Sequence, residues 1–483
     1  MANPIYEHLL QIESKYELNS KEIDGYKMWT YSRLSILYDA LSTGASIPVS
    51  FGEIIRYALP KLFRAASMLF RTCAPKIQNP DILFICHGSR RLSDGVYESY
   101  ITDDIAALYP NSITLEHPTQ DLLHFSPVNT KNLIYSDRFL ICGLISGLLN
   151  RYLRTGKYKK VYNEVKKELY TPLSEFFPKS PEAVNRWITW MSYFYFTYKS
   201  QYRSYEKFLS KVSPSLIVES NNRVEHMIVN EIAKKSKIPT VELQHGIFHN
   251  ELSGYYFPSD NSIPQLPDYL LLFSEFSKEI LLPCSVDESK LIPVGYPYFE
   301  KQVKKYTSRA KLNSKSKTLV ILSLPSPESL ALEKLAIEIY PRLKELGWDI
   351  VFKLHPLECN NWQSVYSLLA SSEIEVVDSP NTNLYELFSQ SDALIGISST
   401  GIYEGIGFNL AAFVYDVPGS ESMGQLCSKG FATKILDSNH LCFELENLDT
   451  AHQKNSSELF KPNALENMKQ VLDQLLAQEE SKG

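Results

Sequence analysis

Two stretches decide the fold: DIVFKLHP at residues 349–356 and ALIGISSTGIYEG at residues 393–405. Each begins as an apolar run rich in β-branched residues and stops at small or polar residues, which is typical of a buried parallel strand. The polar residues then lie where a strand ends and the next element begins. Ligands of open α/β sheets bind at that edge. The two stretches therefore predict a binding edge that carries His355 and the pair Ser398 and Ser399.

Strand and helix patterns alternate on both sides of these stretches. Further strand patterns occur at 81–86, 112–115, 216–219, 239–243, 269–273, 291–295, 318–322, 375–377 and 411–415. Helical patterns between them include 224–235, 328–346 and 384–389. Such βαβ alternation predicts parallel sheets. The predicted fold class is α/β, with two Rossmann-like domains facing a cleft, an extra helical N-terminal region and a helical insertion.

The chain of 483 residues is long enough for two or three domains. A Lys/Ser-rich segment without apolar periodicity predicts a linker between the two Rossmann-like domains. The expected parts are a helical N-terminal region at 1–77, a first domain at 78–300 with its insertion at about 130–210, the linker at 301–317, a second domain at 318–455, and a C-terminal helix and tail at 456–483. The C-terminal helix is expected to cross back to the first domain.

Composition excludes several classes of protein. The formal net charge of −6 argues against a general nucleic-acid binder. The seven cysteines lack the spacing of a zinc site or a disulfide framework, so they are expected to be reduced thiols, and no metal site is predicted. The first residues do not form a signal peptide, and no apolar run approaches a membrane span. The expected location is the cytoplasm.

One segment leaves membrane contact open. Residues 53–76 combine apolar positions at helical spacing with several Arg and Lys residues. A basic amphipathic helix can lie on an anionic membrane surface, here the cytoplasmic face of the inner membrane. A helix packed on its own domain with a solvated basic face shows the same pattern. The sequence favours the packed helix and keeps peripheral membrane contact as the alternative.

The binding edge of the second domain suits an anionic, phosphate-bearing ligand. His355 can donate a proton or a hydrogen bond to a departing phosphate, and Pro356 fixes the turn after it. Hydroxyls and free N–H groups at a helix start also suit a phosphate, and simple capping of the helix is the alternative. The predicted ligand-binding residues are His355, Pro356, Ser398, Ser399, Thr400, Gly401 and Glu404. Glu404 is expected to reach a ribose hydroxyl or base, or else to be a surface glutamate.

Three side chains at strand ends of the first domain are candidates for a general base. His245 follows a strand in Gln244-His245-Gly246 and has the imidazole pKa nearest neutrality. Asp94 follows the first strand, where a plain Ser-Asp-Gly turn is the alternative. Glu219 ends another strand. We rank them in the order His245, Asp94, Glu219, and we expect acceptor contacts from Arg90, Arg91, Gln244 and His249.

The order of these motifs resembles that of bacterial GT-B transferases with cytidine-nucleotide donors. The resemblance covers about residues 80–430 and rests on Gln244-His245-Gly246, Ser274-Glu275-Phe276, Gly295-Tyr296-Pro297, Lys353-Leu354-His355-Pro356 and Ser398-Ser399. One branch is the sialyltransferase, polysialyltransferase and Kdo-transferase group. The other is the CDP-glycerol glycerophosphotransferase family. The resemblance implies that the second domain binds the donor and the first domain binds the acceptor.

Two departures separate the branches. The sialyltransferase group has an acidic-acidic-Gly motif, whereas this chain has Ser93-Asp94-Gly95. The glycerophosphotransferases usually have Asp-Tyr-Ser-Ser, whereas this chain has Gly396-Ile397-Ser398-Ser399. We therefore favour transfer of a CMP-activated sugar of the sialic acid or Kdo type to a glycan or glycolipid acceptor of a bacterial surface polysaccharide. By resemblance the reaction is metal-independent and inverting, with the nucleotide sugar as substrate and no cofactor.

Three other readings stay open at this stage. The first is transfer of a polyol phosphate from a CDP-polyol on the same fold. The second is a non-catalytic GT-B module that binds glycan or scaffolds an assembly complex, against which the intact His355 and double serine argue. The third is a UDP-sugar epimerase, which shares the two-domain fold.

Overall fold

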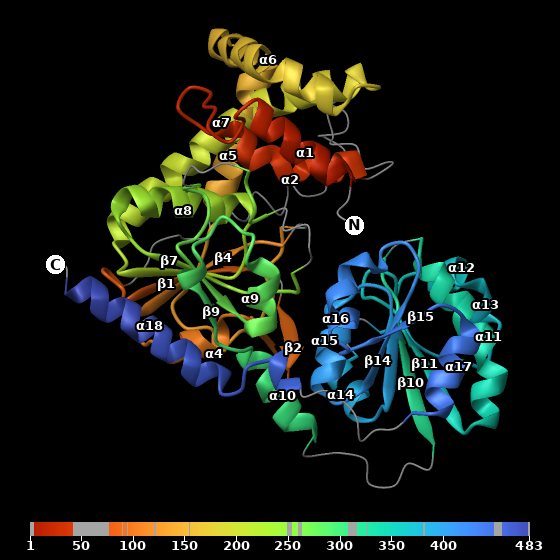
Figure 1. Cartoon of the computed structure of the whole chain (residues 1–483). Coiled ribbons are helices and arrows are strands. Elements are labelled where there is room, and N and C mark those ends of the chain that lie inside the picture. The colour runs from red at the N-terminus through yellow and green to blue at the C-terminus, as the bar shows by residue number, and fades with distance from the viewer. Residues whose placement is uncertain are drawn as a thin grey trace.

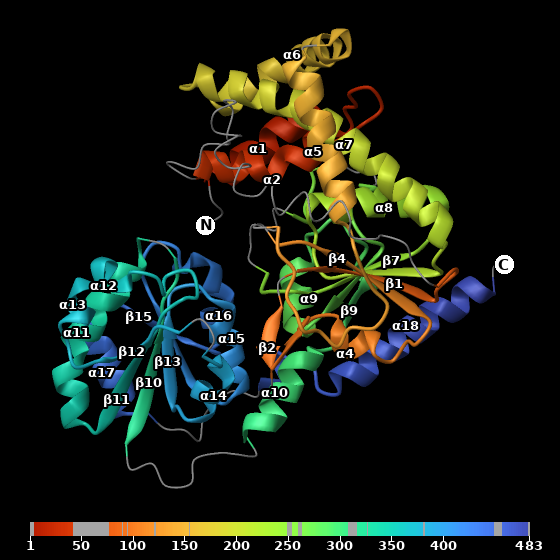
Figure 2. The same cartoon turned by 180° about the vertical axis from the view of Figure 1, so that it is seen from behind.

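The computed structural model describes most of the chain. The described residues are 4–41, 77–88, 90–93, 95–119, 122–153, 155–248, 254–258, 263–307, 316–325, 327–379, 382–448 and 456–481. They form two α/β units and a helical region that lies above the first of them (Figure 1). The view from behind gives the same arrangement (Figure 2).

The first α/β domain is built on a seven-stranded sheet in the order β5-β4-β1-β6-β7-β8-β9, with parallel pairing throughout. Its strands are β1 (Ile82–His87), β4 (Ser112–His117), β5 (Leu133–Tyr135), β6 (Leu216–Glu219), β7 (Thr240–Leu243), β8 (Tyr269–Leu272) and β9 (Leu291–Pro293). Its short helices and hairpin are α4 (Asp103–Ala106), α8 (Val224–Ser236), α9 (Glu275–Leu281), η1 (Glu288–Lys290), α10 (Pro297–Thr307), β2 (Arg91–Ser93) and β3 (Val96–Glu98). The central strands are buried on both faces, which explains their apolar sequences.

The helical region joins the N-terminus to the insertion. It contains α1 (Pro4–Lys15), α2 (Met28–Leu41), α5 (Asp137–Tyr152), α6 (Gly156–Phe176) and α7 (Pro181–Val212). These helices share one apolar cluster with one face of the first sheet. A buried pair, Arg33 Nε to Glu13 Oε1 at 2.7 Å, ties α2 to α1, and Trp29 donates to the same carboxylate. Residues far apart in sequence therefore form one helical layer on the first domain.

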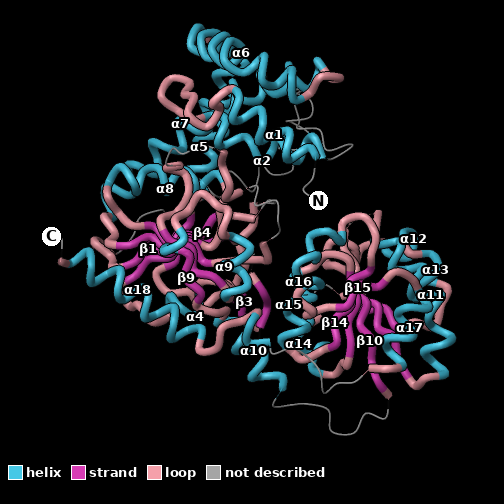
Figure 3. Tube along the Cα trace, viewed as in Figure 1, coloured by secondary structure: helices cyan, strands magenta, loops and turns pink. Residues whose placement is uncertain are grey.

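The second α/β domain has a six-stranded parallel sheet in the order β12-β11-β10-β13-β14-β15. Its strands are β10 (Lys317–Leu322), β11 (Trp348–Lys353), β12 (Glu375–Val377), β13 (Ala393–Gly396), β14 (Ala411–Tyr415) and β15 (Thr433–Ile435). Its helices are α11 (Ser329–Glu345), α12 (Trp362–Val365), α13 (Ser367–Ala370), α14 (Leu384–Ser389), α15 (Thr400–Gly407), η2 (Ser420–Met423), α16 (Gly424–Ser428) and α17 (Ser438–Glu446). Figure 3 shows the two sheets as separate groups of strands.

The chain returns to the first domain at its end. After η4 (Ser456–Glu458), α18 (Ala464–Glu480) runs along the first domain beside α4 and α10 (Figure 1). Asn467 Nδ2 donates to the carbonyl of Val294 at 3.0 Å, and Tyr109 Oη donates to Asp473 at 2.8 Å. This contact confirms the predicted crossing of the C-terminal helix.

The strand orders define one switch point in each sheet. In the first sheet, the connections run outward in opposite directions from β1 and β6; in the second they do so from β10 and β13. Ligands of open parallel sheets bind beyond the carboxyl ends of such strands. The predicted fold class of two Rossmann-like domains with helical additions is confirmed.

Short elements differ from the sequence-based expectation. The hairpin β2–β3 and the strands β5 and β15, with three residues per strand, are absent from the prediction, although the equally short β9 and β12 are part of it. Helix α10 extends to Thr307, so the first part of the predicted linker is helical. Its apolar residues, Tyr298, Phe299 and Tyr306, are buried in an apolar cluster that spans both domains.

Candidate functional site

The carboxyl edge of the second sheet presents His355. Strand β11 pairs with β10 up to Lys353, and the chain then turns at His355 and Pro356. His355 is half-buried, whereas Pro356 is exposed. The buried Lys353 ammonium donates to the carbonyl of Leu354 at 2.6 Å, which holds the strand end next to the turn. The predicted position of His355 at a strand end is confirmed.

Hydrogen bonds fix the His355 turn and the state of its ring. Ser323 Oγ accepts from the His355 backbone N–H at 2.8 Å and donates to Glu358 at 2.5 Å. Tyr366 donates to the same carboxylate. His355 Nδ1 accepts from the Leu357 N–H at 3.2 Å, which leaves the hydrogen on Nε2. Burial lowers the pKa of His355, so the ring is a neutral donor through Nε2 near pH 7.

The two serines have different partners. Ser399 is the N-cap of α15, and its Oγ accepts from the Gly401 N–H at 3.1 Å. Ser398 Oγ lies 2.8 Å from Ser422 Oγ instead. Ser399 thus realises the capping alternative, while Ser398 bridges the strand end to η2. Thr400 is half-buried and lines a small space between the domains.

Glu404 belongs to a buried contact between the domains. It is 3 % exposed and accepts from Tyr385 Oη at 2.8 Å. Arg91, on β2 of the first domain, donates to the same Tyr385 oxygen at 2.6 Å and stacks over the Tyr100 ring at 4.4 Å. Burial raises the pKa of Glu404, while the charge of Arg91 opposes the rise. In this arrangement Glu404 faces Tyr385 and not open solvent, so it is not a surface glutamate.

The carboxyl edge of the first sheet presents His245. Its side chain is 35 % exposed, and its Nδ1 lies 3.6 Å from Oε1 of the buried Glu242. The neighbouring Gln244 is buried and accepts from the Phe273 N–H at 2.6 Å while donating to the Gly246 carbonyl at 2.8 Å. Gln244 therefore shapes the loop that carries His245. Among the described residues, no hydrogen bond or ion pair links His245 to His355.

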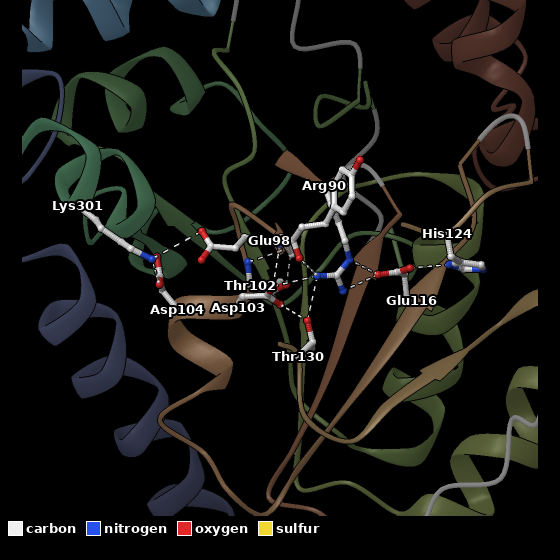
Figure 4. Close-up of polar contacts among 11 residues, drawn as sticks. Arg90, Glu98, Thr102, Asp103, Asp104, Glu116, His124, Thr130 and Lys301 are labelled. Atoms are coloured by element: carbon white, nitrogen blue, oxygen red, sulfur yellow. Dashed lines mark hydrogen bonds and ion pairs between the residues drawn. The ribbon is translucent and has the colours of Figure 1, made fainter. Parts of the chain in front are cut away.

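Two further candidates lie in the protein interior. Glu219 is fully buried, with Oε2 at 3.1 Å from His226 Nδ1, and burial together with the charge of Glu242 raises its pKa well above the usual range. Arg90 is also buried; it donates to Glu116 at 2.6 Å and to Asp103 at 2.9 Å (Figure 4). Glu219 and Arg90 therefore do not occupy the expected open positions at the sheet edge, because buried partner residues enclose each side chain.

Several predicted residues lie outside the described residues. These are Asp94, His249 and the basic segment 53–76. Gly95, next to Asp94, has φ of +83° and follows β2 in the turn of the hairpin. No group of three or more His, Cys, Asp or Glu side chains in the described part of the chain is arranged to hold a metal ion. None of the helices in the described ranges is long and apolar enough to cross a bilayer.

The sequence reasoning missed a group of side chains at the first switch point. His87 ends β1, His117 ends β4, and Arg223 and His226 lie at the start of α8. The signal for this group that the sequence contains is the position of His87 and His117 at the ends of strand patterns. His226 has no such signal, because a histidine inside an apolar helical pattern is indistinguishable from a core residue.

Comparisons with known proteins do not assign this chain to a family. No protein-family model matches it, and no curated protein matches it. Among solved structures, UDP-GlcNAc 2-epimerase from Methanocaldococcus jannaschii is 12 % identical, with a TM-score of 0.49, and the match covers 82 % of this chain and 99 % of that one. The wall teichoic acid polymerase TagF is 14 % identical, with a TM-score of 0.45 and coverage of 89 % and 99 %.

A third solved structure is of the same kind. UDP-GlcNAc 2-epimerase from Neisseria meningitidis bound to UDP-GlcNAc is 12 % identical, with a TM-score of 0.46 and coverage of 82 % of this chain and 100 % of that one. The strand orders of the two sheets define the fold, and the side chains at the sheet edges define the candidate site.

Proposed function

We propose that this protein is a GT-B glycosyltransferase that moves a sugar from a CMP-linked donor to a glycan or glycolipid acceptor of a bacterial surface polysaccharide. The observation that carries the proposal is the neutral His355 ring at the edge of the second sheet, held by Ser323 and Glu358 near the switch point. The choice of a cytidine donor rests on the motif order Gln244-His245-Gly246, His355-Pro356 and Ser398-Ser399.

The proposed reaction is a single displacement at the anomeric carbon. The acceptor oxygen forms the new glycosidic bond while the bond from the sugar to the phosphate oxygen breaks, and CMP leaves. His355 Nε2–H donates to the phosphate as its negative charge grows. The hydroxyl of Ser398 and the first N–H groups of α15 supply further donors. The acceptor proton passes to a base on the first domain.

His245 is the base that the described geometry favours. A base must be accessible to an acceptor hydroxyl. The His245 side chain is partly exposed, and Oε1 of Glu242 lies 3.6 Å from its Nδ1, close enough to orient the ring. Glu219 is enclosed, so it stays in third place behind Asp94. Because His245 and His355 belong to different domains, closure around both substrates would complete the site.

Release of CMP tests the proposal. The protein is incubated with CMP-Neu5Ac, CMP-Kdo and CDP-glycerol, each with and without acceptor glycan. Release of CMP from a CMP-sugar supports the sugar transferase. Turnover of CDP-glycerol, without turnover of either CMP-sugar, would instead identify a CDP-polyol phosphotransferase. Donor binding without turnover on any acceptor would identify a binding module.

The base is tested at saturating donor. His245→Ala should lose acceptor transfer and keep donor affinity, with Asp94→Ala and Glu219→Gln as comparisons. Full transfer by His245→Ala would remove His245 from this role, and the same assay would then show whether Asp94 holds it.

A further inference from the structure

A small cavity lies at the switch point of the first sheet. It has a volume of about 50 Å³, and its lining includes His87, His117, Ser136, Arg223 and His226. These residues follow the carboxyl ends of β1, β4, β5 and β6, which is the ligand-binding edge of such a sheet. A water molecule needs roughly 10–15 Å³ by this kind of measure, so the cavity has room for a group of a few heavy atoms.

Two buried imidazoles meet edge to face in the lining of this cavity, and each has one ring nitrogen without a hydrogen-bond partner among the described residues. His117 and His226 are 5 % and 0 % exposed, and their ring centroids are 5.2 Å apart. His117 Nδ1 lies 2.6 Å from Ser136 Oγ, and His226 Nδ1 lies 3.1 Å from Glu219 Oε2. On each ring Nε2 has no hydrogen-bond partner among the described residues. Since buried polar groups are normally paired, both nitrogens point to a ligand.

The remaining lining favours negative charge. Helix α8 begins after Arg223, which provides no side-chain cap, so the first-turn N–H groups stay available. The Arg223 guanidinium is exposed and lies 2.9 Å from His87 Nε2. Glu225 also lines the cavity and opposes this charge. Donors thus approach from the helix start, from the guanidinium and from two rings, an arrangement that suits a tetrahedral anion more than a planar one.

We propose that this switch-point cavity binds a phosphate group of the acceptor, with Arg223, His117, His226 and the start of α8 as its donors. When Ser136 and a protonated Glu219 donate to the two Nδ1 atoms, each ring presents an Nε2–H to the phosphate. The assignment of the phosphate to the acceptor rests on the proposed function, because the cavity lies in the domain opposite the donor site. Binding of phosphate itself does not depend on that function.

The test is a calorimetric titration with inorganic phosphate, with acetate as the carboxylate comparison. Arg223→Gln changes an exposed side chain and should leave the fold intact. It should weaken phosphate binding by about tenfold to a hundredfold, the loss expected for a hydrogen bond to a charged group. Arg342→Gln, an exposed arginine of α11 in the other domain, is the matched control and should bind as wild type.

Three outcomes overturn the cavity assignment: no phosphate binding by the wild type, equal binding by Arg223→Gln, or acetate binding as tightly as phosphate.

With a phosphorylated acceptor, Arg223→Gln should raise KM for the acceptor by a similar factor and leave KM for the donor unchanged. A normal cytidine donor reaction with no phosphate effect would refute only this inference. Phosphate binding that depends on Arg223, in a protein that binds no cytidine nucleotide, would refute the proposed function and leave the cavity assignment standing.

Discussion

At the scale of single residues, we expect the two adjacent serines to have different roles, with Ser399 as a helix cap and Ser398 as a ligand-binding residue. Ser399 caps α15 through the Gly401 N–H, whereas the Ser398 hydroxyl lies 2.8 Å from the Ser422 hydroxyl. Ser399→Ala should therefore lower the free energy of unfolding by about 1 kcal/mol, the usual cost of a lost cap. Ser398→Ala should leave stability nearly unchanged and weaken nucleotide binding by about 1.5–3 kcal/mol.

Thermal unfolding and nucleotide titration of both variants check this division. If Ser398→Ala lowers stability while nucleotide affinity stays at the wild-type value, Ser398 is structural as well. The double variant measures any coupling between these adjacent residues, because only independent losses would add.

His124 provides a pH-dependent contribution to stability. Its Nδ1 contacts Glu116 (Figure 4), 2.5 Å from Oε1, and its Nε2 lies 2.7 Å from Asp137 Oδ1. Burial opposes its charge, but the hydrogen bonds that its ring donates to the Asp137 and Glu116 carboxylates together raise its pKa above the usual value of 6.5. A raised folded pKa means that the stabilisation is full below the unfolded pKa and is lost as pH rises through the folded pKa.

The expected result is a loss of stability as pH rises above about 6.5, which His124→Gln should remove. The variant should also be less stable than wild type by about 1–3 kcal/mol at pH 6. Urea unfolding at a series of pH values measures both effects. If the free energy of unfolding depends on pH in the same way for wild type and variant, the His124 ring is neutral in the folded protein.

Much of the residue-level site could be predicted, because strand ends are visible in sequence. His355 and His245 lie at strand ends as expected. Arg90, Glu219 and Glu404 lie in enclosed positions, because their partners Glu116, His226 and Tyr385 come from other elements that the fold packs against them. Burial of a charged side chain depends on such partners, and one sequence does not reveal them.

At the scale of elements, the turn after β9 anchors the C-terminal helix. Gly295 has φ of +103°, and a Cβ there would lie 2.2 Å from the Lys461 carbonyl oxygen, just before α18. Gly347, with φ of +76°, has nothing within 4 Å of such a Cβ. Gly347→Ala should cost only the strain of its backbone, about 1–2 kcal/mol. Gly295→Ala adds a clash with the Lys461 carbonyl oxygen, so it should lower the free energy of unfolding by more than Gly347→Ala does.

Differential scanning calorimetry of the two variants measures the difference. Gly295→Ala should also make α18 more sensitive to proteolysis, because the clash pushes the returning chain away from the first domain. Equal melting temperatures for the two variants would contradict this role of the close approach.

The longer elements could be predicted from sequence, as could the three-residue strands β9 and β12, whereas β5 and β15 could not. Strands such as β10 and β11 have six residues and a continuous apolar core pattern. Strands β5 and β15 have three residues each, which is less than two periods of a strand pattern. Their pairing at the sheet edges depends on the neighbouring strand and not on their own sequence.

At the scale of the whole molecule, Arg91 holds the two domains together. It bonds Tyr385 of the second domain and stacks on Tyr100 of the first. Arg91→Ala should weaken the interface by about 2 kcal/mol, from one charge-assisted hydrogen bond and one stacked contact. The scattering radius of gyration should rise, while each domain keeps its own core.

Lys301→Ala is the control for this prediction, because Lys301 pairs with Glu98 and Asp104 within the first domain. It should leave the radius of gyration unchanged. The same unchanged value for Arg91→Ala would show that the apolar cluster between the domains sets their arrangement without this contact.

The central claim is that the second domain binds a cytidine nucleotide donor and that His355 acts on its departing phosphate. The most direct measurement is CMP affinity and CMP release from a CMP-sugar, compared between wild type and His355→Ala. We predict that both proteins bind CMP and that His355→Ala lowers turnover by about 10² to 10³, the usual cost of removing a hydrogen-bond donor that faces a developing negative charge. Near-normal turnover by His355→Ala, or no binding of CMP by the wild type, would contradict the account.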